Sequence, residues 1–95
     1  MYNDNMRHCK PDRNKKEIAE AARACGCCWF DQDVYAGFDA VLVAPNGIHI
    51  VEVKASSNYK LTPNEIMTKA MIENVGKVYN IIITVDDVIA LIGFA

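Results

Sequence analysis

The sequence lacks a long hydrophobic run. No stretch of 18 consecutive apolar residues occurs among its 95 residues, so no membrane-spanning helix is predicted. The first sixteen residues, MYNDNMRHCKPDRNKK, are polar and lack the apolar segment of a secretory signal peptide. Internal repeats and low-complexity segments are also absent. These absences predict a cytoplasmic protein with one soluble domain.

The chain also lacks a strong net charge. Ten Lys and Arg residues stand against twelve Asp and Glu residues, which gives −2, so overall charge makes no case for a nucleic-acid partner. Half of the cations, however, fall in the first 16 residues: Arg7, Lys10, Arg13, Lys15 and Lys16. Such a segment can follow a phosphate backbone or can be an ordinary solvated terminus. We expect a flexible basic arm over 1–14 and a single domain over 15–95.

The four cysteines lack the paired C-x2-C spacing of zinc knuckles. His8 and Cys9 could combine with Cys25-x-Cys27-Cys28 to hold zinc in an interaction domain. Free thiols are the simpler interpretation, because a cytosolic chain rarely forms disulfides and an unpaired cysteine behaves as a small hydrophobic residue.

The order of apolar segments and turn signals predicts an α/β fold with the element order αβββαβα. A helix is expected over 15–25, because Ile18, Ala21, Ala22 and Cys25 form an apolar stripe. Strands are expected over 27–30, 40–44, 48–54 and 78–84, the last buried on both faces. The second helix begins after Thr62 with Pro63 and Glu65 in a capping-box arrangement, and a short third helix ends near Ile92. A mixed sheet with helices packed against it follows from this order.

Three charged residues interrupt the central hairpin GFDAVLVAPNGIHIVEVK. Alternation along a strand places Glu52 and Lys54 on one face. A turn at Pro45-Asn46 puts Asp39 opposite Glu52, whereas a tip at Asn46-Gly47 puts it opposite Lys54. Both registers place Asp39, Glu52 and Lys54 on the same face.

Two adjacent carboxylates repel each other and are costly to desolvate. A divalent cation such as Mg²⁺ resolves this, since it binds one or two carboxylates together with waters and phosphate oxygens. The backbone carbonyl of Val53 is a further candidate ligand, and Lys54 can orient water or stabilise charge on a phosphate. The alternative is a plain salt bridge between Glu52 and Lys54, with Asp39 closing a loop.

These residues resemble the PD-(D/E)XK nucleases, and most closely the small phage-type VRR-NUC domains. That family reads G-x-P-D, then P-N-G, then E-[LV]-K-A, then K-L-x-x-x-Q. The matching segments, within a resemblance that covers about 15–93, are Gly37-Phe38-Asp39, Pro45-Asn46-Gly47, Glu52-Val53-Lys54-Ala55 and Lys60-Leu61-Thr62-Pro63-Asn64-Glu65. The series in this order is far more specific than E-x-K alone.

The resemblance implies a restriction-endonuclease-like αβββαβ core and DNA cleavage that depends on Mg²⁺ or Mn²⁺. It further implies a homodimer, branched or structured DNA as a substrate of some members, and the host cytoplasm for a phage-encoded chain. Asp39 and Glu52 would ligate the metal and Lys54 would be catalytic. Members also carry a glutamate on the first helix, for which Glu17 fits better than Glu20.

The chain departs from the family pattern at several positions. Glu65 replaces the family's Gln, so its carboxylate either helps the metal or closes the helix cap. Trp29-Phe30 stands where members often have a lysine, and Phe38 replaces a proline. A catalytically inactive nuclease-like fold that binds nucleic acid or protein is therefore the competing interpretation. Ile66, Met67 and Met71 are expected in the core or at a dimer face.

Overall fold

The computed structural model describes residues 9–93, which form three helices and one four-stranded sheet. The elements are α1 (Cys9–Ala24), β1 (Cys28–Asp31), β2 (Ala40–Ala44), β3 (Gly47–Val53), α2 (Pro63–Asn74), β4 (Tyr79–Ile82) and α3 (Val85–Leu91). This is the expected αβββαβα order, and the mixed α/β fold is confirmed. No helix within 9–93 is both long and apolar enough to cross a membrane.

The first helix begins earlier than its apolar stripe indicates. It begins at Cys9 rather than Lys15, so residues 9–14 of the expected arm are helical. Residues 1–8 lie outside the described part of the chain, and the arm is otherwise untested. The stripe itself is confirmed, because Ile18 and Ala22 are fully buried. Gly26, with φ of +84°, ends the helix in the left-handed conformation that glycine adopts without strain.

The strands lie in the order β1-β2-β3-β4. The first three are antiparallel, and β4 is parallel to β3 after the crossover through α2. Strand β4 is therefore an edge strand, and Val78 before it is exposed, so the expectation of a strand buried on both faces was wrong. Only Tyr79 and Ile82 are buried in it.

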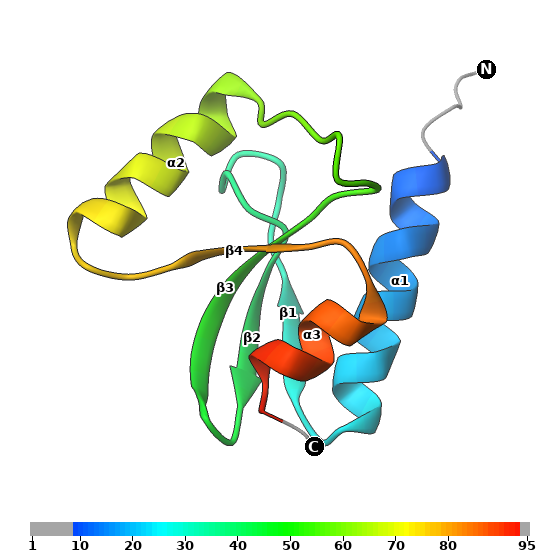
Figure 1. Cartoon of the computed structure of the whole chain (residues 1–95). Helices are drawn as coiled ribbons and strands as arrows, with labels where there is room; N and C mark the ends of the chain where they lie inside the picture. The colour runs from blue at the N-terminus through cyan, green and yellow to red at the C-terminus, as the bar shows by residue number, and fades with distance from the viewer. Residues whose placement is uncertain (1–8, 94–95) are drawn as a thin grey trace.

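One apolar layer holds the domain together. Helices α1 and α3 cover the same face of the sheet (Figure 1). Their side chains pack on alternate residues of the strands, and the fully buried ones are Ile18, Ala22, Ala40, Leu42, Val51 and Val88. Burial of this kind stabilises by roughly 1.5–3 kcal/mol for each large aliphatic side chain. Because strand residues alternate, Glu52 and Lys54 lie on the opposite face.

Helix α2 lies apart from this layer (Figure 1). None of its residues, all of which are described, is buried. Ile66, Met67 and Met71 are more than half exposed, so the first of the two expectations, a place in the core, was wrong, and the dimer face stays a prediction. Polar contacts hold the N-terminal end of α2. Thr62 and Glu65 form the predicted capping box, and Asn64 Nδ2 donates to the Tyr35 carbonyl.

Candidate active site

The register of the hairpin places the acidic pair. Ala44 pairs with Gly47 and Ala40 with Val51, so the chain turns at Pro45-Asn46. Asp39, one residue before β2, therefore lies opposite Glu52, as the first of the two registers predicts. The Asp39 N–H donates to the Val51 carbonyl at 2.9 Å, and the Val53 N–H donates to Asp39 Oδ2 at 2.7 Å.

A close packing of three elements fixes the loop that leads to Asp39. Gly37 has φ of +82°, and a side chain there would collide with Thr68 of α2. The Tyr79 hydroxyl donates to the Gly37 carbonyl at 2.6 Å from β4. The positive φ and the lack of space beside Thr68 both require glycine, and the Tyr79 hydrogen bond fixes this backbone two residues before Asp39.

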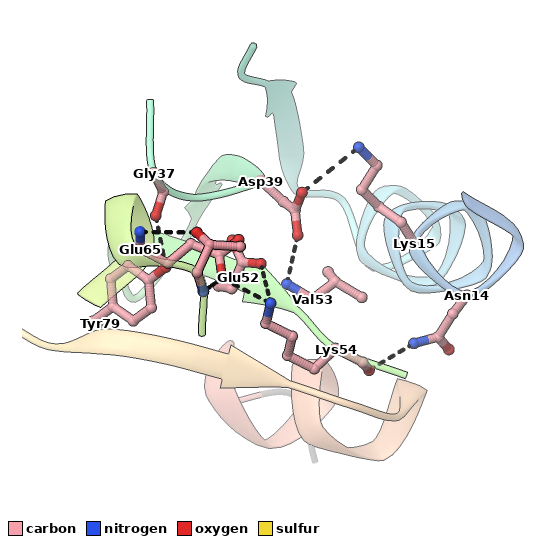
Figure 2. Close-up of polar contacts among 10 residues, drawn as sticks. Asn14, Lys15, Gly37, Asp39, Glu52, Val53, Lys54, Glu65 and Tyr79 are labelled. Carbon is pink, nitrogen blue, oxygen red and sulfur yellow. Dashed lines mark hydrogen bonds and ion pairs between the residues drawn. The ribbon is translucent and has the colours of Figure 1, made fainter. Parts of the chain in front are cut away.

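Lys54 lies between two carboxylates. Its Nζ is 2.8 Å from Glu65 Oε1 and 3.3 Å from Glu52 Oε2, and its side chain is 15% exposed (Figure 2). Its backbone is held as well, because Asn14 Nδ2 of α1 donates to the Lys54 carbonyl at 2.9 Å and to the Ile83 carbonyl at 3.2 Å. Nothing in the spacing of the sequence signals this role of Asn14.

The site contains more negative than positive charge in a confined space. Glu52 is 4% exposed. Its burial and the nearby Asp39 and Glu65 raise its pKa from 4.5 to about 8, against the opposing effect of Lys54. Burial lowers the pKa of Lys54, but its hydrogen bond to Glu65 and the charges of both glutamates outweigh this and raise it. Lys54 is therefore a cation at neutral pH.

Glu65 both caps α2 and binds Lys54. Its Oε1 accepts from the Thr62 N–H at 2.9 Å and from Lys54 Nζ at 2.8 Å. Burial raises its pKa, but the hydrogen bonds from Lys54 and Thr62 outweigh burial and lower it. The predicted helix cap is thus confirmed, and the same carboxylate also reaches the charged cluster.

Two hollows adjoin the acidic pair, and both are lined by Lys15, Asp39 and Glu52. One, of about 360 Å³, is completed by Val53, Lys54 and the loop after β3 through Ala55, Ser56, Tyr59 and Lys60. The other, of about 280 Å³, is bounded by the loop 32–38 and the start of α2. A substrate can therefore reach both sides of the carboxylates.

The first helix contributes a cation to this site. Lys15 Nζ lies 3.8 Å from Asp39 Oδ1, and Figure 2 shows its side chain directed from α1 toward that carboxylate. Glu17 and Glu20 are both exposed, and neither lines the two hollows. The structure thus brings together Asp39, Glu52, Lys54 and Glu65, but it does not bring Glu17 to them.

The oxygen donors at this site suit a hard cation that needs few ligands from the protein. The described residues contain no group of three or more His, Cys, Asp and Glu side chains arranged for a metal. Mg²⁺ nevertheless needs only one or two carboxylates, because waters and phosphate oxygens complete its shell. Within residues 9–93, Lys15 at 3.8 Å is the cation beside Asp39 Oδ1, and Glu52 carries a raised pKa that an added cation would lower. The residues therefore fit such an ion.

The three cysteines whose side chains the structure describes are free thiols and belong to no metal-binding group of three or more ligands. Cys27 is buried, which raises the pKa of its thiol, whereas Cys28 is exposed and Cys25 is half-buried. His8 lies outside the described residues, and nothing is described of the Cys9 side chain. His49 Nε2 instead lies 2.9 Å from Asn46 Oδ1 at the hairpin tip, far along β3 from Glu52.

Comparison with known proteins identifies the fold. No protein-family model and no curated protein matches the sequence. A solved structure described as a VRR_NUC domain matches with a TM-score of 0.69 and 25% identity, over 90% of this chain and 96% of its own. The chain thus has the restriction-endonuclease-like fold of the PD-(D/E)XK nucleases. This VRR-NUC-like fold suggests a nuclease-type domain.

We expect Glu65→Gln to separate the two roles of that residue. Glutamine also closes a capping box, so stability should change by less than about 1 kcal/mol. Loss of the negative charge should lower the pKa of Glu52, because Glu65 contributes to raising it. Carboxyl ¹³C NMR titration would measure this shift. Asp87→Asn in the matching box of α3 is the control and should leave Glu52 unchanged; an unchanged Glu52 titration in Glu65→Gln would contradict the coupling.

Proposed function

We propose that this chain is a metal-dependent DNA endonuclease that hydrolyses phosphodiester bonds with Mg²⁺ or Mn²⁺. The observation that supports this most strongly is the convergence of Asp39, Glu52 and Lys54 beside one hollow, from positions 15 residues apart in the sequence. A plain salt bridge requires only Glu52 and Lys54 and leaves Asp39 unexplained. The VRR-NUC-like fold supports the same class of reaction.

Each residue has a chemical part in this proposal. Asp39 and Glu52 would hold the cation, with the Val53 carbonyl as a third oxygen donor. The bound ion would supply Lewis acidity toward the phosphate and lower the pKa of a bound water. Lys54, protonated and fixed by Glu65, would donate to the attacking water or to a phosphate oxygen as negative charge develops there. Glu65 positions Lys54, and Glu17 has no part because it lines neither hollow.

The test is a cleavage assay with Mg²⁺ or Mn²⁺ on supercoiled duplex, single-stranded and branched DNA. We expect wild-type protein to cut at least one of them, with branched or structured DNA as the form that the family resemblance favours. EDTA should stop the reaction, and Lys54→Ala should slow it by about 10²- to 10³-fold. Binding without cleavage under either metal would support the alternative, a nuclease-like fold that acts as a binding module. The cytoplasmic location remains a prediction.

We further propose that the protein acts as a homodimer through the outer surface of α2. Met67, Met71 and Val75 recur every four residues and are all at least 60% exposed. This spacing forms one apolar stripe along the helix. A single domain of this size would cover little DNA, so a second copy that buries the stripe would also extend the contact with the substrate.

A charged residue in that stripe should therefore dissociate the dimer. We expect Met71→Lys to sediment as a monomer at concentrations where wild type is dimeric, because an unpaired charge would be buried at the interface. Glu73→Gln changes net charge by the same amount on another side of α2 and should remain dimeric. Wild-type protein that remains monomeric at about 100 μM would contradict this part of the proposal.

A further inference from the structure

The two hollows beside the acidic pair share a cation that the fold places there from α1. Lys15 lines both of them, together with Asp39 and Glu52. It is one turn before the buried Ile18, so the packing of α1 on the core fixes where this lysine emerges. A strand that passes from one hollow to the other would run beside the Lys15 ammonium.

Lys15 remains available to a ligand, in contrast to Lys54. Its Nζ lies 3.8 Å from Asp39 Oδ1, its side chain is 31% exposed, and that of Asp39 is 28% exposed. An ion pair this long and this exposed contributes little energy. Lys54 contacts two carboxylates at 2.8 and 3.3 Å and is half as exposed. The two lysines therefore serve different purposes: Lys54 is held by protein carboxylates, and Lys15 keeps donors for an outside anion.

A second exposed cation lines the larger hollow from a different element. Lys60 lies in the loop between β3 and α2 and lines this hollow together with Tyr59 and Ser56. Lys15 and Lys60 thus add two positive charges to a hollow whose floor carries Asp39 and Glu52. A polymer with repeated phosphates matches this arrangement, because one phosphate can meet the floor while its neighbours meet the lysines.

We propose that Lys15 and Lys60 bind the phosphates on either side of the phosphodiester that is cut, so that the strand lies across the acidic pair from one hollow to the other. This inference rests on the proposed nuclease function and assigns to it two substrate-positioning residues. It also gives α1 a part at this site, because the helix presents the Lys15 ammonium where the family resemblance implied the Glu17 carboxylate.

The test measures DNA binding by fluorescence anisotropy in EDTA over a range of KCl concentrations. Log K falls with log salt, and each lost phosphate contact makes this slope less steep by about 0.9 on duplex DNA and about 0.7 on a single strand. We expect this reduction for Lys15→Ala and for Lys60→Ala, with affinity lower by about tenfold at 0.1 M salt. Lys15→Arg should restore the slope, because arginine also pairs with phosphate.

Matched controls separate these contacts from general surface charge. Lys16→Ala removes the neighbouring exposed cation of α1, and Lys69→Ala removes a half-buried cation of α2 that pairs with Glu73; neither residue lines the hollows. Both should shift the slope by less than a third of the Lys15→Ala effect. In cleavage assays, Lys15→Ala should raise KM about tenfold and change kcat less than threefold. Lys15→Gln, also uncharged, and Lys60→Ala keep the test valid if Lys15→Ala fails to fold.

Two outcomes are distinguishable. Wild-type protein that binds and cuts DNA, together with Lys15→Ala and Lys60→Ala whose slopes equal those of the controls, would overturn this inference and leave the nuclease proposal standing. Wild-type protein that neither binds nor cuts any of the three DNA forms would overturn the nuclease proposal and this inference with it.

Discussion

Replacing Lys54 with alanine should lower the metal-dependent cleavage rate by about 10²- to 10³-fold, the usual effect of removing one preorganised charge at a reacting centre. The effect should fall on kcat, because Lys54 is held by Glu52 and Glu65 rather than exposed for substrate capture. Steady-state kinetics on the best of the three DNA substrates would measure it. Lys69→Ala on α2 is the control for the loss of a lysine and should keep wild-type kcat.

The protonation state of Lys54 sharpens this prediction. Its pKa is raised above 10.5, since its contacts with the two glutamates outweigh the effect of burial. Lys54 therefore acts as a charged donor and not as a proton acceptor at neutral pH. Lys54→Arg keeps the charge but changes the donor geometry, so it should recover part of the rate. A kcat for Lys54→Ala within threefold of wild type would contradict a catalytic role.

The same substitution should destabilise the fold in a pH-dependent way. Without Lys54, the buried Glu52 loses its counter-charge and its pKa rises further above 8. At pH 6 Glu52 is protonated in both proteins, so the loss in unfolding free energy should come from the broken Lys54–Glu65 pair alone and be smaller than at high pH. At pH 9 Glu52 is largely ionised in wild type and its charge is offset by Lys54, whereas the variant lacks this counter-charge. We therefore expect Lys54→Ala to lose about 2–3 kcal/mol of unfolding free energy at this pH. Kinetic comparisons are therefore best made near pH 7.

The hairpin at the centre of the site could be predicted because its determinants are local. Pro45-Asn46 sets a two-residue turn, the turn sets the register, and the register sets Asp39 opposite Glu52. The capping box of Thr62 and Glu65 is equally local and was also confirmed. These features depend on residues within a few positions of one another, or on strand alternation, so the sequence contains the information directly.

Contacts between distant elements could not be predicted in this way. Asn14 binds the Lys54 carbonyl across 40 positions, and Tyr79 binds the Gly37 carbonyl across 42. Lys15 reaches Asp39 because of how α1 packs on the sheet, whereas its sequence indicated only a basic terminal segment. The resemblance directed attention to Glu17, and helical periodicity alone cannot say which end of a helix borders a site.

The exposure of α2 could not be predicted from the sequence for a similar reason. Helical spacing of Ile66, Met67 and Met71 indicates a buried stripe, and the structure leaves all three exposed. Periodicity shows that Met67 and Met71 share a side of the helix, but it does not show what covers that side. A second copy of the chain could cover this apolar side, which is the reason for proposing the dimer interface on α2.

Replacing Glu52 with glutamine should stabilise the metal-free protein at alkaline pH. Glu52 has a folded-state pKa of about 8 against 4.5 when unperturbed, so the folded state binds more protons than the unfolded state between these values. Stability of wild type should therefore fall as pH rises from about 4.5 to about 8 and stay low above it. Glutamine cannot ionise, so this loss disappears. We expect a gain of about 1–3 kcal/mol at pH 8.5 and less than about 1 kcal/mol at pH 5.

The same variant should bind metal far more weakly. Wild-type affinity for Mg²⁺ should rise as pH approaches 8, by up to about tenfold per unit, because a proton must leave Glu52 before the ion can bind there. Glu52→Gln should remove this pH dependence and lower affinity by at least about 100-fold, more than the loss of an outer partner costs. Isothermal titration calorimetry in buffers of different ionisation enthalpy would measure both affinity and proton release. Asp86→Asn on α3, an exposed acidic residue that lines neither hollow, is the control and should titrate as wild type. If Glu52→Gln unfolds instead, the carboxylate is needed for the fold and a metal-binding role for it loses its support.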